Sequence, residues 1–295
     1  MWIFITLFAA GCQSVRTAYQ NTLARETGFL HATMSRSLYG LPLVSLYLVI
    51  CWQLFGWVTL DQNLIFFVAA SVCAVAQIMA TYFMLRTFQS GSFAIGTLLA
   101  KTEAVLAALI GLPLLHYTLT LGSWIGIAMG VLGAVVMSVK WQNIRQVHKD
   151  ISLLLGLASG LCFAITSVTA SIASHSLSGS IITSAGVTLW YVLALQSIIL
   201  CSIQIYKSKD IFAPFKHEFA LSCKVGVLSS LGSIGWFTGF ALVNPALVKT
   251  LGQIEIVGTL YYSKVRFAEK MTKQQWIGGT MILISVILVV VSTIK

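Results

Sequence analysis

Ionisable side chains inside long apolar stretches are the residues of this sequence best suited to chemistry. Taking a charge out of water is costly, so a charged group in such a place is usually paired or functional. Seven residues meet this description: Arg16, Arg36, Arg86, Lys101, Glu103, Lys249 and Glu255. The arginines are close enough to the ends of their stretches to reach the surface, which is the structural alternative for them. Lys101, Glu103 and Glu255 lie near the middle of theirs.

The spacing of these charges divides them between helix faces. Residues two apart on a helix point to roughly opposite sides, so Lys101 and Glu103 cannot both face one cavity squarely. Lys249 shares its side with Gln253, and Glu255 lies about one and a half turns further on. We expect one set of charges to line a cavity and the other to tie its helix to a neighbour, with Glu103 able to meet Lys249 across a helix pair. The alternative is that all these charges form buried structural ion pairs.

Amide and aromatic side chains could complete a pocket around these charges. Gln77, Tyr82, Trp190, Tyr191 and Trp236 lie in or near apolar stretches. For each tyrosine and tryptophan, a place at the membrane interface is the alternative. The residues that we predict to bind a substrate or ion are Glu103, Glu255, Lys101, Lys249, Gln253, Arg16, Arg36, Gln77, Tyr82 and Trp236.

The remaining reactive groups argue against enzymatic chemistry. The sequence contains no HExxH, Walker or GxSxG motif. Its five histidines lie near predicted loops and helix ends without metal spacing, and we expect them at the surface. Its six cysteines form no CxxC pair and fall mainly in apolar stretches, which is typical of small buried side chains. We therefore predict no enzymatic activity, no metal site, no cofactor and no disulfide.

The elements that must position these groups are membrane helices. Of the 295 residues, 58% are hydrophobic and only 9% are charged, and the mean hydropathy is +0.90. A soluble domain carries about a quarter charged residues. The net charge of +10 comes from Lys and Arg in short loops, which suits cytoplasmic loops and not nucleic-acid binding. The N-terminus lacks the features of a removable signal, and we interpret it as the first membrane helix.

Ten apolar stretches are long enough to span a bilayer, which takes roughly 20 residues. The sequence predicts an all-α integral membrane protein with about ten transmembrane helices. Their predicted bounds are 2–22, 31–55, 63–86, 91–111, 119–140, 151–172, 180–205, 219–243, 246–263 and 273–293.

The two halves of the chain resemble each other. Lys101-Thr102-Glu103 and Trp124-Ile125-Gly126 recur as Gln253-Ile254-Glu255 and Trp276-Ile277-Gly278, at one offset, since 255 − 103 = 152 and 276 − 124 = 152. We predict five-helix repeats at 1–141 and 151–295, joined by a polar linker at 142–150. Because five is odd, the second repeat enters the membrane from the opposite side. Inverted repeats of this kind recur in secondary transporters.

Loop charges and small residues refine this arrangement. The loops at 56–62 and 114–120 contain no Lys or Arg, whereas the corresponding loops of the second half are basic. The positive-inside rule then places both termini outside the cytoplasm. Small residues at helical spacing in two spans predict close helix contacts: Gly126, Gly130 and Gly133 in one, and Gly226, Ser229, Ser230, Ser233 and Gly239 in the other.

Several short motifs resemble the drug/metabolite transporter superfamily, in particular its EamA-type ten-helix members. In the second half these are Asn244-Pro245-Ala246 and Glu269-Lys270-Met271-Thr272 followed by Trp276-Ile277-Gly278. Other stretches resemble a bacterial branch of that family: Gln13-Ser14-Val15-Arg16, residues 36–42, residues 94–104 and Gly252-Gln253-Ile254-Glu255. His116 and Tyr117 stand where the first repeat often carries a Glu. The resemblance implies a secondary transporter, often an exporter of metabolites or amino acids, in the bacterial cytoplasmic membrane.

The leading hypothesis is a secondary transporter that moves a small anionic or zwitterionic metabolite by alternating access. Counting Arg16, Arg36, Lys101 and Lys249 against the two glutamates gives 4 − 2 = +2 inside the membrane. Coupling to protons is a further hypothesis, with Glu255 as the titrating group because Gln253 replaces the lysine found beside Glu103. A facilitator with Glu255 paired to Lys249 is the alternative to coupling. A membrane-embedded enzyme or a lipid-handling protein without ion coupling is the alternative to transport. The expected partners are a small-molecule substrate, membrane lipids and protons, without nucleic acid.

Overall fold

The computed structural model describes residues 1–59, 63–89, 102–116, 119–138, 151–208, 218–255 and 272–294. Nearly all of this described chain is helical, and its β-structure is limited to one isolated bridge between Thr59 and Ser178. The helices are α1 (Trp2–Thr27), α2 (Phe29–Leu38), α3 (Leu41–Phe55), α4 (Leu64–Gln89), α6 (Glu103–Leu115), α7 (Leu121–Ser138), α8 (Ile151–His175), α9 (Ile181–Ser208), α11 (Phe219–Leu242), α12 (Pro245–Gly252) and α14 (Lys273–Ile294). The all-α prediction is confirmed.

Five helical stretches are long and apolar enough to cross a membrane by themselves. They are Phe29–Phe55, Leu64–Thr87, Leu154–His175, Ile181–Lys207 and Phe219–Leu242. Shorter apolar helices at Glu103–Leu115, Leu121–Val136 and Trp276–Ser292 accompany them. The parts of the predicted fourth and ninth spans at 91–101 and 256–263 lie outside the described residues.

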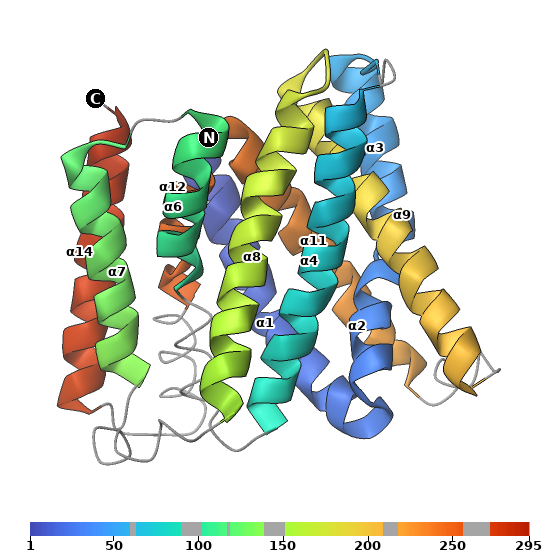
Figure 1. Cartoon of the computed structure of the whole chain (residues 1–295), viewed down its shortest axis with the longest axis horizontal. Helices are drawn as coiled ribbons and strands as arrows, with labels where there is room; N and C mark the ends of the chain where they lie inside the picture. The colour runs from blue at the N-terminus through green and yellow to red at the C-terminus, as the bar shows by residue number, and fades with distance from the viewer. Residues whose placement is uncertain are drawn as a thin grey trace.

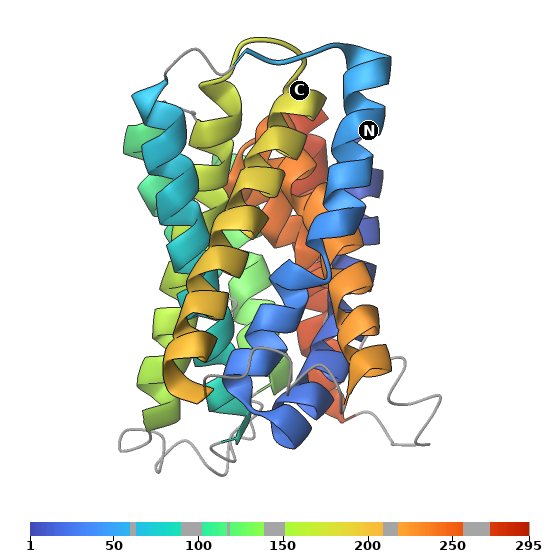
Figure 2. The ribbon, with the colours of Figure 1, turned by 90° about the vertical axis from the view of Figure 1, so that its right-hand side faces the viewer.

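The second predicted span is one continuous crossing built from two helices. α2 ends at Leu38 and α3 begins at Leu41, with Pro42 in its first turn. Proline has no backbone N–H to donate to the preceding turn, so a helix interrupted here loses little by the break. Figure 2 shows the change of direction between the two segments.

The helices stand side by side, and the two halves of the chain run through the bundle in opposite senses (Figure 1). α1 begins at the end of the bundle where both termini lie, whereas α8 begins at the opposite end. α1 packs along α11 as α8 packs along α4, and α7 with α14 and α3 with α9 form pairs. A two-fold exchange of the halves would map this packing onto itself. The packing thus supports the predicted repeats, whose boundaries at 141 and 151 stay a prediction.

Small residues let the helix backbones approach closely, as predicted. On α7, a Cβ added to Gly126 would lie 2.8 Å from Val289 Cγ2, and one added to Gly133 would lie 2.8 Å from the Gly278 carbonyl oxygen of α14. On α11, a Cβ added to Gly239 would lie 3.1 Å from Val248 Cγ1 of α12. Packing of this kind holds membrane helices together where no hydrophobic driving force exists between them.

The basic residues of the described helix ends give a test of orientation. Arg25, Lys207 and Lys273 belong to helix ends on the side of the bundle opposite both termini (Figure 1). The positive-inside rule makes that side cytoplasmic. In a cysteine-free background, we expect a membrane-impermeant maleimide to label His175→Cys in intact cells and to label Glu26→Cys only after lysis. The reverse pattern would contradict this orientation and place both termini inside.

Candidate substrate-binding site

The short helix α12 carries the centre of the candidate site. Its first turn is fixed by Asn244, whose Oδ1 accepts a hydrogen bond of 2.9 Å from the Ala246 backbone N–H, and by Pro245 at the first helical position. All eight residues of α12 are buried. The helix ends at Gly252 and a turn at Gln253, after which Ile254 and Glu255 are again helical. Two polar side chains lie at this interruption: Gln253, which is buried, and Glu255, which is half-buried.

Lys249 forms a buried ion pair with Glu103 of α6. Its Nζ lies 3.0 Å from Glu103 Oε2, and the two side chains are only 7% and 10% exposed. Glu103 stands in the first turn of α6, where the helix dipole favours a negative charge. The meeting of these two residues across a helix pair was among the sequence predictions and is confirmed.

Three aromatic rings complete the surroundings of Lys249. Its Nζ lies 4.9 Å from the ring centroid of Trp236, 5.3 Å from that of Phe163 and 5.5 Å from that of Phe240. The ring faces attract the ammonium group and compensate part of its lost hydration. Gly252 permits this arrangement, because a Cβ at this position would overlap the Trp236 indole.

The second carboxylate, Glu255, lies against α1. Gln13 Nε2 donates a hydrogen bond of 3.2 Å to Glu255 Oε2, and the Glu255 carboxylate attracts Arg16 electrostatically. Arg16 is 6% exposed, so it does not reach the surface as the structural alternative supposed. Its Nε has no hydrogen-bond partner among the described residues. The guanidinium therefore keeps a donor that a ligand could use.

Arg36 of α2 is a buried cation held by neutral groups. Its Nε donates to Ser229 Oγ at 3.0 Å and its Nη1 to Thr81 Oγ1 at 2.8 Å, and the side chain is 3% exposed. Arg16 and Arg36 are close enough to repel each other. A buried cation with hydroxyl partners and a like charge nearby is well suited to bind an anion.

Gln253 adds uncompensated hydrogen-bonding capacity. Its carboxamide is buried, yet neither its Oε1 nor its Nε2 has a partner among the described residues, and the same holds for Ser285 Oγ and Trp236 Nε1. A Cβ added to Gly130 would lie 2.5 Å from Gln253 Oε1 and 2.6 Å from Ser285 Oγ, so both groups meet at the α7 backbone. Buried polar groups without partners are rare in proteins, and a ligand or water would satisfy them.

The remaining predicted residues are placed differently. Gln77 Oε1 accepts a hydrogen bond of 2.8 Å from Gln196 Nε2, which ties α4 to α9. The Tyr82 side chain is 36% exposed, and its hydroxyl accepts a 3.3 Å hydrogen bond from Arg86 Nε. Tyr82 therefore lies on the outer face of α4, while Thr81 next to it faces Arg36. Lys101 lies outside the described residues.

One sequence prediction about histidine is wrong. His31 was expected at the surface but is only 2% exposed, because α2 packs against α11. Its Nε2 lies 3.2 Å from Ser222 Oγ and 3.4 Å from Ser35 Oγ. These hydroxyls replace the water that a surface histidine would have.

Several contributors to the site were not predicted. Gln13, Thr81 and Ser229 contact the buried charges, but polar residues of these types are frequent in membrane helices and carry no distinctive signal. Phe163 and Phe240 are indistinguishable in sequence from core residues. Among the described residues, Arg16, Arg36, Lys249 and Glu103 are buried and Glu255 is half-buried, so these five charges sum to 3 − 2 = +1. Lys101, which was part of the predicted charge count, lies outside the described residues, so the predicted total of +2 stays a prediction.

Comparison with known proteins places this geometry in a family. Residues 150–291 match the EamA-like transporter family. The second half of the chain is thus similar to the EamA-like transporter family. This family is part of the drug/metabolite transporter superfamily, as the motifs indicated, and its members are transporters and not enzymes. The match agrees with an all-α integral membrane protein, and the family that it names consists of membrane transporters of small molecules.

The fold of the whole chain is found in solved structures. One, titled only "Crystal structure of protein", is 15% identical and superposes with a TM-score of 0.72 over 100% of this chain and 99% of its own. The match extends the shared fold to the first half, outside the family match. No curated protein matches the chain in sequence.

The Lys249–Glu103 pair predicts a characteristic pattern of stability. Removing one partner of a buried ion pair leaves an uncompensated charge and costs about 3–5 kcal/mol. We expect Lys249→Met and Glu103→Gln each to lower the thermal unfolding temperature in detergent, and the double variant to recover most of the loss. Exposed Lys224→Met is the matched control and should change little. Additive losses in the double variant would show that the two residues are not coupled.

Proposed function

We propose that the protein is a secondary transporter that binds a small anionic or zwitterionic metabolite between Arg16, Arg36 and Lys249 and moves it by alternating access. The observation that carries this proposal is the buried positive charge beside unpartnered polar groups. In a membrane interior, such groups are costly unless a ligand uses them. We place the protein in the bacterial cytoplasmic membrane on the resemblance of its motifs.

Arg36 is the best primary ligand for the anionic group. Its present partners are hydroxyls, which a carboxylate or phosphate can replace with a stronger, charge-assisted bond. Lys249 would have to exchange Glu103 for the substrate, while the aromatic rings hold its ammonium in place. An amino group on the substrate would find its counter-charge at Glu255. A zwitterion therefore suits the arrangement of charges better than a simple cation.

Two interrupted segments next to these charges favour alternating access. The α2–α3 break follows Arg36 within one turn, and the turn at Gln253 separates Lys249 from Glu255. Discontinuous helices at substrate sites are a recurring feature of transporters with inverted repeats. Movement of one repeat against the other would change the distances between Arg16 on α1, Arg36 on α2 and Lys249 on α12.

The second part of the proposal is that transport is coupled to protons through Glu255. Lys249 is paired with Glu103, whereas Glu255 lies against Gln13 and Arg16, and we assign the role of proton carrier to Glu255. The alternative of a facilitator with Glu255 paired to Lys249 is thereby weakened. A facilitator would instead have Glu255 paired with Arg16, because these two side chains attract each other electrostatically.

Transport of defined solutes would test the proposed substrate class. In proteoliposomes, we expect uptake of radiolabelled glutamate, malate or glycerol 3-phosphate to exceed that of choline. Losing a hydrogen bond to a charged group costs about 1.5–3 kcal/mol, so Arg36→Gln should lower uptake of the accepted anion roughly 10- to 100-fold. Exposed Arg86→Gln is the control and should retain uptake. Choline as the preferred solute would overturn the charge argument.

An imposed pH gradient would separate the two carboxylates. We expect Glu255→Gln to carry out exchange of solute across the membrane but to lose accumulation driven by the pH step. Glu103→Gln frees Lys249 from its ion pair and leaves Glu255 in place, so uptake by this variant should still respond to the gradient. Accumulation by Glu255→Gln against its gradient would exclude Glu255 as the proton carrier.

A further inference from the structure

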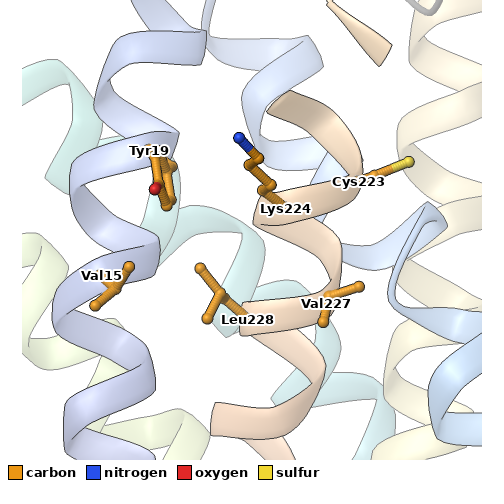
Figure 3. Close-up of a pocket in the computed structure, with 6 residues that line it drawn as sticks. All are labelled: Val15, Tyr19, Cys223, Lys224, Val227 and Leu228. Carbon is orange, nitrogen blue, oxygen red and sulfur yellow. The ribbon is translucent and has the colours of Figure 1, made fainter. Parts of the chain in front are cut away.

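The outer face of the α1–α11 pair carries a groove that is separate from the candidate substrate site. Its volume is about 490 Å³, and it is lined by Val15, Tyr19, Cys223, Lys224, Val227 and Leu228 (Figure 3). Val15 and Val227 are 48% and 42% exposed. Their neighbours Arg16 and Ser229 are buried on the inner faces of the same helices. The groove therefore opens toward the surroundings of the bundle and not toward its interior.

The groove has one polar end and one apolar end. Lys224 Nζ lies 5.7 Å from the ring centroid of Tyr19, and Figure 3 shows these two side chains at the same level. Val15 and Leu228 lie at the next level along the two helices. An ammonium and a phenol above a wall of aliphatic side chains match a molecule with a polar head and a hydrocarbon chain.

The polar end lies near a membrane interface. Lys224 is five residues after Phe219, where α11 begins, which corresponds to about 7.5 Å along the helix. A lysine at this depth reaches the headgroup region, and tyrosine favours the same level. This end of α11 is on the side of the bundle where Arg25, Lys207 and Lys273 gather, the side expected to face the cytoplasm (Figure 1).

We propose that this groove is a binding site for one anionic phospholipid. The lipid phosphate binds the Lys224 ammonium, the Tyr19 hydroxyl reaches the headgroup, and one acyl chain lies along Val15, Val227 and Leu228. The charge of the groove favours this occupant, because the cytoplasmic leaflet contains anionic lipids and basic sites between membrane helices attract them. The apolar wall favours a lipid over a free phosphate, which would leave that wall uncovered. The site does not depend on which solute the protein transports.

Native mass spectrometry of the full chain in detergent would test the site. We expect one phosphatidylglycerol to be retained in preference to phosphatidylcholine. One lysine near an anionic membrane surface is worth about a fivefold change in binding, so Lys224→Gln should lower retention by about that factor. Lys207→Gln, an exposed lysine on the same side but outside the groove, is the matched control and should not change it. An equal loss in both variants, or equal retention of the two lipids, would mean unspecific charge attraction and overturn the proposal.

Two further arms test the occupant itself. Val227→Trp fills the apolar part while leaving Lys224 in place, and it should also lower retention of phosphatidylglycerol. Unchanged retention would show that no acyl chain lies there. Millimolar inorganic phosphate should not displace the bound lipid. Displacement by phosphate alone would mean that the polar end is an ion site and not a lipid site.

Discussion

The structure depends on a buried ion pair inside a membrane bundle. Lys249 is neutralised by Glu103 at 3.0 Å and covered by the rings of Trp236, Phe163 and Phe240. An unpaired charge inside a membrane bundle is costly, so the residues that surround Lys249 have to compensate its charge. The pair fixes α12 against α6, and Gly252 is required because a larger residue would displace the Trp236 ring. The surroundings of Lys249 on α12 thus join side chains from three other helices, α6, α8 and α11.

The excess of cations follows from how the remaining charges are shared. Glu103 is committed to Lys249, and Glu255 is divided between the Gln13 amide and Arg16. Arg36 is left with hydroxyl partners alone among the described residues. In a low dielectric, an anion entering this region would gain strongly from the unbalanced charge. The unpartnered amide of Gln253 lies on the same segment and offers both a donor and an acceptor.

The two-fold relation of the helix pairs explains why these residues meet at the centre. Glu103 begins α6 and Glu255 follows α12, and the two glutamates stand at one offset of 152 in the sequence. Because α6 packs against α12, both carboxylates belong to neighbouring segments of the bundle. Their surroundings differ, because the first is paired with a lysine and the second with an amide and an arginine. The two carboxylates thus have different surroundings although they stand at corresponding positions of the sequence.

The sequence by itself determined the helices, the membrane character and the candidates for buried charge. Apolar stretches and hydrogen-bonding rules leave few alternatives to helices in a bilayer, and ionisable residues inside such stretches are few enough to be identified singly. The tertiary structure alone decided the partners. Periodicity does not reveal the rotation and register of one helix against another, so it could not show that Tyr82 faces outward, that His31 is buried, or that Phe163 and Phe240 cover Lys249. Those outcomes depend on side chains from helices far apart in sequence, which only packing brings together.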